Sequence, residues 1–308
     1  MPETRIALVT GATAGLGRAV AAALAASDMH VLVHGRDAKR AAAVVDSITT
    51  SGGTAQAVLA DLASLDQVRL LADRVTADHG SIALLVNNAG VGAGRPPYRR
   101  RQLSADGHEL RLAVNYLAPA LLSRRLIPAL SNGELARIVN VGSVGQAPVD
   151  FADLRMDAGY TGPQAYYRSK FALAAFTFDL AEELVGSGIT VNCLHPASLM
   201  NTHMVRESMV PPMSTVSAGV KAVLNLATGP VGGMATGRYF DGTSQARAHE
   251  GTYDPATRSR LRAVTAELLA PTWQPAPVDV TAMSIRPDGR TQRERQSSSW
   301  VIRGEGPL

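Results

Sequence analysis

Short, apolar, β-branched runs alternate with longer segments rich in alanine and leucine from residue 5 to about residue 194. Strands that are covered on both faces read as short apolar runs, and the helices that connect them read as longer segments. This alternation is typical of βαβ units. It predicts an α/β fold, namely a single doubly wound parallel sheet with helices on both faces.

The pattern also predicts where each element lies. We expect strands over residues 6–10, 30–34, 55–59, 83–87, 137–141 and 190–193, and a last short strand ending at residues 239–240. We expect helices over residues 15–26, 37–50, 65–78, 107–130, 165–185, 215–226 and 255–268. From about Pro271 the apolar periodicity stops, so residues 271–308 are predicted to be a polar tail, extended or disordered.

Composition and charge exclude several classes of function. A net charge of +4 on 308 residues is too small to indicate nucleic-acid binding. The single cysteine, Cys193, leaves no internal disulfide framework and no thiolate set for a metal, which favours a cytoplasmic protein. The longest apolar stretch, residues 19–26, is far below the roughly 18 residues of a membrane span, and we expect no secretory leader. We therefore predict no nucleic-acid partner, no membrane and no metal.

A glycine-rich loop joins the first expected strand to the first expected helix. Glycine lets the backbone turn tightly and approach a phosphate, whose charge is attracted by the free N–H groups of a helix start. At the first βα turn this pattern favours a dinucleotide site over a merely tight turn. The cofactor-binding candidates in this loop are Gly11, Thr13, Gly15, Leu16 and Gly17.

The end of the second expected strand bears on the identity of the dinucleotide. An acidic side chain there accepts the ribose hydroxyls of NAD, whereas a basic one meets the extra phosphate of NADP. The chain has Gly35 followed by Arg36, which favours NADP over NAD. The alternative is that Arg36 is an ordinary surface residue. Asp37 is better suited to cap the next helix than to bind ribose.

Two further strand ends place residues at the same edge of the predicted sheet. Asp61 and Leu62 follow the third expected strand, and residues 87–90, Asn-Asn-Ala-Gly, follow the fourth. In an open parallel sheet a ligand lies at the carboxyl ends of the strands. Asp61, Leu62, Asn88, Ala89 and Gly90 are therefore cofactor-binding candidates. Asp61 could instead cap the following helix, a task for which Ser64 is equally suited.

Three side chains point to proton chemistry. Ser143 follows the fifth expected strand, and Tyr166 and Lys170 share one face of the next helix because they are four residues apart. A nearby ammonium favours the phenolate, so we expect the pKa of Tyr166 to fall from about 10 toward neutrality. The Ser143 hydroxyl could then hold a reacting carbonyl oxygen beside the phenol. The alternative is a solvated Tyr–Lys pair. Only the order of all the motifs along the chain argues against it.

Taken in order, the motifs resemble those of the short-chain dehydrogenase/reductase family. The resemblance extends over residues 5 to about 268 and rests on Thr10-Gly11-x-x-x-Gly15-x-Gly17, Asp61, Asn87-Asn88-Ala89-Gly90, Asn115, Ser143 and Tyr166-x-x-x-Lys170. It implies a Rossmann-like fold in which residues 1–270 form a dinucleotide-binding oxidoreductase domain and residues 196–230 form a substrate loop.

The resemblance also implies roles for four catalytic residues. Tyr166, rather than its neighbour Tyr167, would be the general acid/base, and Ser143 would orient the substrate. Lys170, with Tyr166, would bind the nicotinamide ribose, and Asn115 would hold a water of a proton relay. Independently of the family, Pro119 has no N–H with which to bond the Asn115 carbonyl. We expect that carbonyl to accept the relay water; the alternative is a simple proline kink.

Later features are similar to the retinol-dehydrogenase-like branch of this family. They are residues 150–154, His195-Pro196, Thr202 and residues 236–242. This similarity implies a partly apolar alcohol, aldehyde or ketone as substrate, and it adds Pro196 and Thr202 to the cofactor-binding candidates. Resemblance to the family also leads us to expect a homo-oligomer that pairs through the helices over residues 107–130 and 165–185. Ala197 and Gly142 depart from the residues usual at their positions, and the membrane leader of some relatives is missing, which leaves the substrate open.

Competing interpretations remain at this point. The fold would equally serve a non-catalytic NADP-binding sensor or interaction module, although such a protein needs no Ser–Tyr–Lys set. The basic run over residues 95–101 is better explained as a solvated loop than as a nucleic-acid site. The methionines at 200, 204, 209 and 213 could line an adaptable apolar pocket or form the buried stripe of a short helix.

Overall fold

The computed structural model describes residues 5–97, 100–131 and 136–270. The chain divides into two units, Met1–Ala276 and Pro277–Leu308, and every described residue belongs to the first. The predicted tail, residues 271–308, lies outside the described residues, as do Tyr98 and Arg99 of the basic run.

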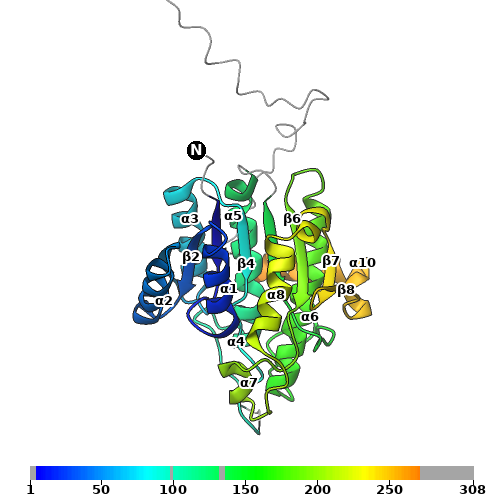
Figure 1. Cartoon of the computed structure of the whole chain (residues 1–308). Helices are drawn as coiled ribbons and strands as arrows, with labels where there is room; N and C mark the ends of the chain where they lie inside the picture. Colours follow the sequence, from blue (N-terminus) through cyan, green and yellow to red (C-terminus); the bar gives the residue numbers. More distant parts are fainter. Residues whose placement is uncertain (1–4, 98–99, 132–135, 271–308) are drawn as a thin grey trace, which may run out of the picture. The chain divides into compact units, whose positions relative to one another are not determined.

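One eight-stranded sheet forms the centre of the first unit (Figure 1). Its strands are β1 (Ile6–Val9), β2 (His30–Gly35), β3 (Thr54–Leu59), β4 (Leu84–Asn87), β5 (Arg137–Val141), β6 (Thr190–His195), β7 (Arg238–Asp241) and β8 (Ser244–Ala246). They lie in the order β3-β2-β1-β4-β5-β6-β7-β8. All neighbours are parallel except β7 and β8, which form an antiparallel pair.

Helices cover both faces of this sheet, which confirms the predicted doubly wound fold. The longer ones are α1 (Gly15–Ala25), α2 (Ala38–Thr50), α3 (Leu65–His79), α5 (Ala118–Ser131), α6 (Gly162–Glu183), α8 (Val216–Ala227) and α10 (Pro255–Leu269). α1 packs against α2 and α8 on one face, and α5 packs against α3 and α6 on the other. α10 packs on the outer side of α6.

The order in which the chain adds strands to the sheet reverses beside β1. The connections from β1 lead outward through β2 to β3, and the chain then returns to β4 on the other side of β1. In open α/β sheets the crevice at such a switch point, at the carboxyl ends of the strands, is where ligands bind. The glycine-rich loop follows β1 and residues 88–90 follow β4, so both lie at this crevice.

Local sequence signals explain the helix starts. The Asp37 carboxylate accepts the Arg40 N–H at 3.0 Å, which confirms Asp37 as the cap of α2. The Ser64 hydroxyl accepts the Gln67 N–H at 3.4 Å, so Ser64 rather than Asp61 caps α3. Thr161 caps α6 and Pro163 follows in its first turn. α6 therefore begins at Gly162, three residues before its predicted start.

The helix expected over residues 107–130 is interrupted. It consists of α4 (Leu110–Leu112), a π-helical turn over Ala113–Leu117 and α5. In the π turn the Ala118 N–H bonds to the Ala113 carbonyl, five residues back instead of four. Pro119 follows directly and has no N–H to donate. The interruption therefore falls where the helix lacks a backbone hydrogen bond.

Short elements were absent from the prediction. α7 (His203–Glu207), α9 (Pro230–Met234), the 3₁₀ turn η2 (Glu250–Tyr253) and β8 are each five residues or fewer. None of the residues of α7 is buried. A helix without a buried face has no apolar periodicity by which the sequence could reveal it.

Candidate active site

The glycine-rich loop packs so closely on the segment after β4 that two of its positions require glycine. Gly11 has a φ of +63°, and a Cβ there would lie 2.8 Å from the Cα of Ala89. A Cβ on Gly17 would overlap both the Gly11 carbonyl and the Asn88 amide. The cap residue of α1 is Ala14, whose side chain makes no capping bond, so the first turn of α1 keeps its N–H groups for a ligand.

Polar side chains fasten the glycine-rich loop to the same segment. The Thr10 hydroxyl accepts the N–H groups of Asn88 and Ala89 at 2.9 and 3.0 Å. The Asn88 side-chain amide donates to the Thr10 carbonyl at 2.8 Å and to the Gly11 carbonyl at 3.3 Å. Asn88 therefore holds the shape of the loop with its side chain. Leu16 and Gly17, in the first turn of α1, are buried.

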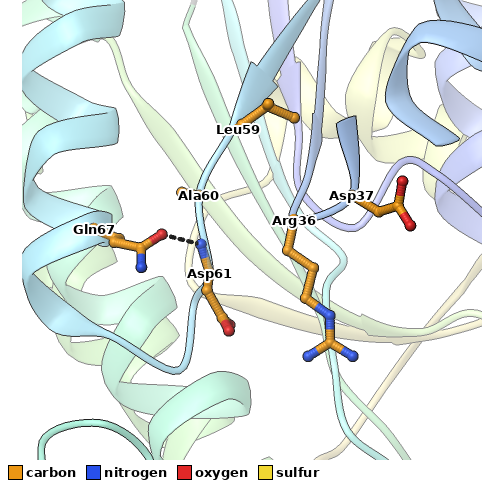
Figure 2. Close-up of a pocket in the computed structure, with 6 residues that line it drawn as sticks. All are labelled: Arg36, Asp37, Leu59, Ala60, Asp61 and Gln67. Atoms are coloured by element: carbon orange, nitrogen blue, oxygen red, sulfur yellow. Dashed lines mark hydrogen bonds between the residues drawn. The ribbon is translucent and has the colours of Figure 1, made fainter. Parts of the chain in front are cut away.

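A pocket of about 620 Å³ opens beside the ends of β2 and β3, lined by Arg36, Asp37, Leu59, Ala60, Asp61 and Gln67 (Figure 2). This volume is sufficient for a small-molecule group. Arg36 and Asp61 both extend into it, whereas the Gln67 side chain accepts the Asp61 N–H at 2.8 Å. Leu62, the residue after Asp61, is buried and does not line the pocket. The exposed guanidinium of Arg36 is the cationic group that could meet a phosphate here.

Ser143, Tyr166 and Lys170 lie together at the ends of β5 and on α6. The Ser143 side chain lies close enough to Tyr166 to lower the pKa of its phenol. Lys170 is buried, donates from Nζ to the Val141 carbonyl at 2.7 Å, and lies 5.8 Å from the centre of the Tyr166 ring. Tyr167 is 42% exposed, whereas Tyr166 is partly buried.

The expected lowering of the tyrosine pKa is wrong for this structure. Burial raises the pKa of Tyr166 above its usual value, and the Ser143 side chain offsets this only in part. Lys170 does not offset this shift; its ammonium donates to the Val141 carbonyl. Burial also lowers the pKa of Lys170 to about 8. Spacing on a helix revealed the neighbourhood of the two groups but not their desolvation.

Two side chains that the sequence did not single out hold Ser143 in place. The Tyr239 hydroxyl and the Gln146 amide donate to the Ser143 carbonyl at 2.9 and 2.7 Å. Tyr239 is buried on β7, 96 residues away in the chain. Only the sheet order brings it here, so no local signal could have predicted it.

Asn115 is fully buried on the π turn, and its side chain joins two segments of the site. It accepts the Val91 N–H at 2.7 Å and donates to the Val91 carbonyl and the Ser169 hydroxyl, each at 3.0 Å. Asn115 thus fixes the segment after β4 against α6, which carries Tyr166 and Lys170. The relay water expected at its main-chain carbonyl stays a prediction.

A buried ion pair holds the next residues of the same segment. The Arg111 guanidinium donates to the carbonyls of Gly92 and Ala93 at 2.7 and 3.2 Å, and it pairs with Glu109 at 3.1 Å. The Tyr160 hydroxyl accepts from Arg111 at 2.6 Å and donates to Glu109 at 3.1 Å. Burial and the Glu109 carboxylate raise the pKa of Tyr160 to about 12, so this phenol stays protonated. The sequence analysis missed this network.

The segment after β4 connects the glycine-rich loop to the catalytic candidates. Ala89 contacts Gly11, and a Cβ on the neighbouring Gly90 would lie 3.8 Å from the Lys170 ammonium and 3.3 Å from the Asn115 amide oxygen. The glycine-rich loop and Lys170 therefore contact consecutive residues of one short segment. A dinucleotide bound at the loop would have the Ser143, Tyr166 and Lys170 side chains at its far end.

The segment after β6 crosses the same region. Buried Pro196 begins it, and the Thr202 methyl group would lie 3.4 Å from a Cβ at Gly15. The Met204 side chain packs over Gly90 and Gly92. Met209 and Met213 are 75% and 77% exposed. The four methionines are therefore not the buried stripe of a helix.

Gly142 occupies the position next to Ser143 where a larger residue would meet Cys193. A Cβ on Gly142 would lie 2.6 Å from the buried Cys193 sulfur. We expect Gly142→Ala to lower the free energy of unfolding by about 1–3 kcal/mol, because the core has no room for the methyl group. In a Cys193→Ala background the same substitution should cost less than half as much. Denaturant unfolding of the four proteins measures this coupling, and equal costs in both backgrounds would contradict it.

Comparison with known proteins identifies the family. Residues 5–210 match the short chain dehydrogenase family. Retinol dehydrogenase 12 of Homo sapiens is 29% identical over 283 residues, which cover 88% of this chain and 88% of that protein. Polyprenol dehydrogenase of Mus musculus is 40% identical over 214 residues, 66% of this chain and 62% of that protein. A short chain dehydrogenase from Burkholderia cenocepacia J2315, solved in complex with NADP, is 32% identical with a TM-score of 0.61, covering 78% of this chain and 97% of that one.

The chain belongs to the short-chain dehydrogenase family and is an oxidoreductase of that family. Within it, the similarity to retinol dehydrogenases 11, 12 and 13 places the chain in the retinol-dehydrogenase-like branch.

Two further properties concern the described residues alone. None of the helices over residues 5–97, 100–131 and 136–270 is long and apolar enough to cross a bilayer. Within the same residues, no group of three or more His, Cys, Asp or Glu side chains is arranged to hold a metal ion.

Proposed function

We propose that the protein is an NADP-dependent oxidoreductase that interconverts an alcohol and the corresponding aldehyde or ketone, with Tyr166 as the proton donor and acceptor. The observation that carries this proposal is the proximity of partly buried Tyr166 to buried Ser143 and Lys170, with Gly90 linking Lys170 to the glycine-rich loop. NADP, when bound, would supply or accept the hydride.

The proposed roles follow from the contacts. In the reductive direction Tyr166 protonates the alkoxide oxygen while the Ser143 hydroxyl stabilises it. Tyr239 and Gln146 bond to the main-chain carbonyl of Ser143 and so fix the backbone that carries this hydroxyl. Lys170 holds the nicotinamide ribose. Asn115 contributes through the segment that it fixes against α6.

The cofactor-binding proposal has three parts. The glycine-rich loop, with Gly11, Thr13, Gly15, Leu16 and Gly17, takes the pyrophosphate. Arg36, beside Asp61 and Leu62, takes the phosphate that distinguishes NADP from NAD. Asn88, Ala89, Gly90, Pro196 and Thr202 line the remaining length of the cofactor. NADP in the complex of the Burkholderia cenocepacia relative supports this choice.

The preference for NADP should depend on Arg36. We expect Arg36→Asp to lower kcat/KM for NADPH at least tenfold relative to that for NADH, because a carboxylate repels the phosphate and accepts ribose hydroxyls. Arg74→Asp makes the same change of charge on an exposed part of α3 outside the pocket and should leave the ratio unchanged. Steady-state kinetics with both cofactors measure the ratio. An unaltered preference in Arg36→Asp would place the phosphate elsewhere.

A partly apolar substrate fits the segment after β6. Met204 lies against the segment beside Lys170, and Met209 and Met213 expose flexible apolar side chains nearby in sequence. Relatives named for retinol and polyprenol support the same class.

The function is tested by monitoring the absorbance of NADPH as it is oxidised in the presence of a panel of aldehydes and ketones of increasing apolar length. Turnover that rises with apolar length supports the proposal. The non-catalytic sensor would instead be favoured if the protein binds NADPH but reduces no member of the panel and oxidises none of the corresponding alcohols with NADP⁺.

A further inference from the structure

His34 is a buried histidine at the end of β2, only 2% exposed, and the proposed chemistry does not use it. Its ring contacts two backbone groups. The Gly11 N–H donates to Nδ1 at 3.2 Å, and Nε2 lies 3.2 Å from the Ala60 carbonyl oxygen. An N–H can only donate and a carbonyl can only accept, so Nδ1 is bare and Nε2 carries the proton. The two contacts together select one neutral tautomer.

The same residue also holds the neighbouring N–H of the loop. The His34 carbonyl accepts the Ala12 N–H at 2.8 Å. Main chain and side chain of His34 thus bind two consecutive donors of the glycine-rich loop. On its other side the loop is bound by Asn88, through the Thr10 and Gly11 carbonyls. Gly11, with its positive φ, is therefore held from both sides.

The second ring contact reaches the neighbouring pocket. Ala60 lines the pocket with Arg36 and Asp61 (Figure 2). One imidazole ring therefore bridges the loop that would take a pyrophosphate and the wall that would take the ribose phosphate. Burial lowers the pKa of His34 to about 4, against the opposing effects of the bond to the Ala60 carbonyl and of the Asp61 carboxylate, so the ring is neutral near pH 7.

We propose that His34 is a positioning residue for the dinucleotide site. Its Nδ1 holds the Gly11 N–H so that the glycine-rich loop keeps its phosphate-binding shape. The bond of Nε2–H to the Ala60 carbonyl fixes the tautomer in which Nδ1 is the acceptor, a function that the Oδ1 of an asparagine does not need. This inference rests on the proposed use of NADP.

Two substitutions separate the two contacts. The Oδ1 of asparagine takes the place of Nδ1, whereas the Nε2 of glutamine takes the place of the histidine Nε2. His34→Asn therefore keeps the acceptor for Gly11, and His34→Gln keeps the donor to Ala60. Calorimetric titration of the full chain with NADP⁺ should give an affinity within about threefold of wild type for His34→Asn. For His34→Gln it should be about tenfold weaker, the effect of one lost hydrogen bond.

A merely structural role gives a different pattern. Each variant removes one hydrogen bond, so both should lower the melting temperature to a similar extent, and NADP⁺ affinity should then not distinguish them. Equal affinities, or weaker binding by His34→Asn than by His34→Gln, would overturn the proposal.

A second measurement needs no variant. The ¹⁵N shifts of the His34 ring in the wild-type protein should show a bare Nδ1 and a protonated Nε2, and the Nδ1 signal should move on addition of NADP⁺. The opposite tautomer would overturn the proposal even if both variants fail to fold. Wild-type protein that binds NADP⁺ but turns over no substrate contradicts the proposed function while the two variants still test His34.

Discussion

Replacing Tyr166 with phenylalanine should reduce turnover by about 10²–10⁴-fold, because the substitution removes the only proposed proton donor to the substrate oxygen. The Tyr166 ring lies near Ser143 and 5.8 Å from the ammonium of buried Lys170. Phenylalanine keeps the ring and its packing, so NADPH affinity should remain within a few fold of wild type. Stopped-flow measurement of hydride transfer, together with NADPH titration, separates the chemical step from binding.

Tyr167 supplies the matched control. It is adjacent in sequence, its ring lies 6.0 Å from that of Tyr166, and it is 42% exposed. Tyr167→Phe should retain most of the wild-type turnover. Near-normal turnover by Tyr166→Phe would refute the assignment of the acid/base, whatever the result for Tyr167.

Replacing Arg111 with methionine should lower the free energy of unfolding by about 3–5 kcal/mol, since it leaves the Glu109 charge buried without its partner. Side chains of both residues are almost completely buried, with 4% and 1% exposed. The substitution also leaves the Gly92 and Ala93 carbonyls without their donor. Denaturant unfolding, checked for two-state behaviour, gives the value.

The exposed pair of Arg74 and Asp78 provides the comparison, with side chains 61% and 46% exposed. Arg74→Met should cost less than about 1 kcal/mol. Adding Glu109→Gln to Arg111→Met should recover part of the loss, because the buried charge is then removed. Equal costs for the two arginines would mean that the buried network contributes no more than a surface pair.

Much of the sheet could be predicted from sequence, because a strand buried on both faces has no alternative to a short apolar run. The predicted strands at residues 30–34 and 137–141 differ from β2 and β5 by one residue or less. The helix caps could be predicted as well, since Asp37 and Ser64 each accept a hydrogen bond from a residue only three positions later. The meeting of Ser143 with Tyr166 followed from their places at one edge of the sheet.

What could not be predicted depends on contacts between distant segments or on burial. Tyr239 reaches Ser143 only because β7 lies beside β6, and Tyr160 reaches Arg111 through an irregular segment without periodicity. The predicted direction of the Tyr166 pKa shift was wrong because burial, which the sequence does not show, is its largest cause.

The π turn at Ala113–Leu117 has a consequence for how this chain can vary in length. A five-residue hydrogen-bonded step in place of four adds one residue to the turn, and each residue of a helix advances it by about 100°. Because the π turn takes up this extra residue within itself, α4 and α5 keep nearly the relative orientation of two parts of one regular helix. Deleting a residue of the turn other than Asn115 should therefore restore a regular helix without rotating α5. A deletion inside α5 itself would instead turn every later side chain of that helix by about 100° away from its buried surroundings.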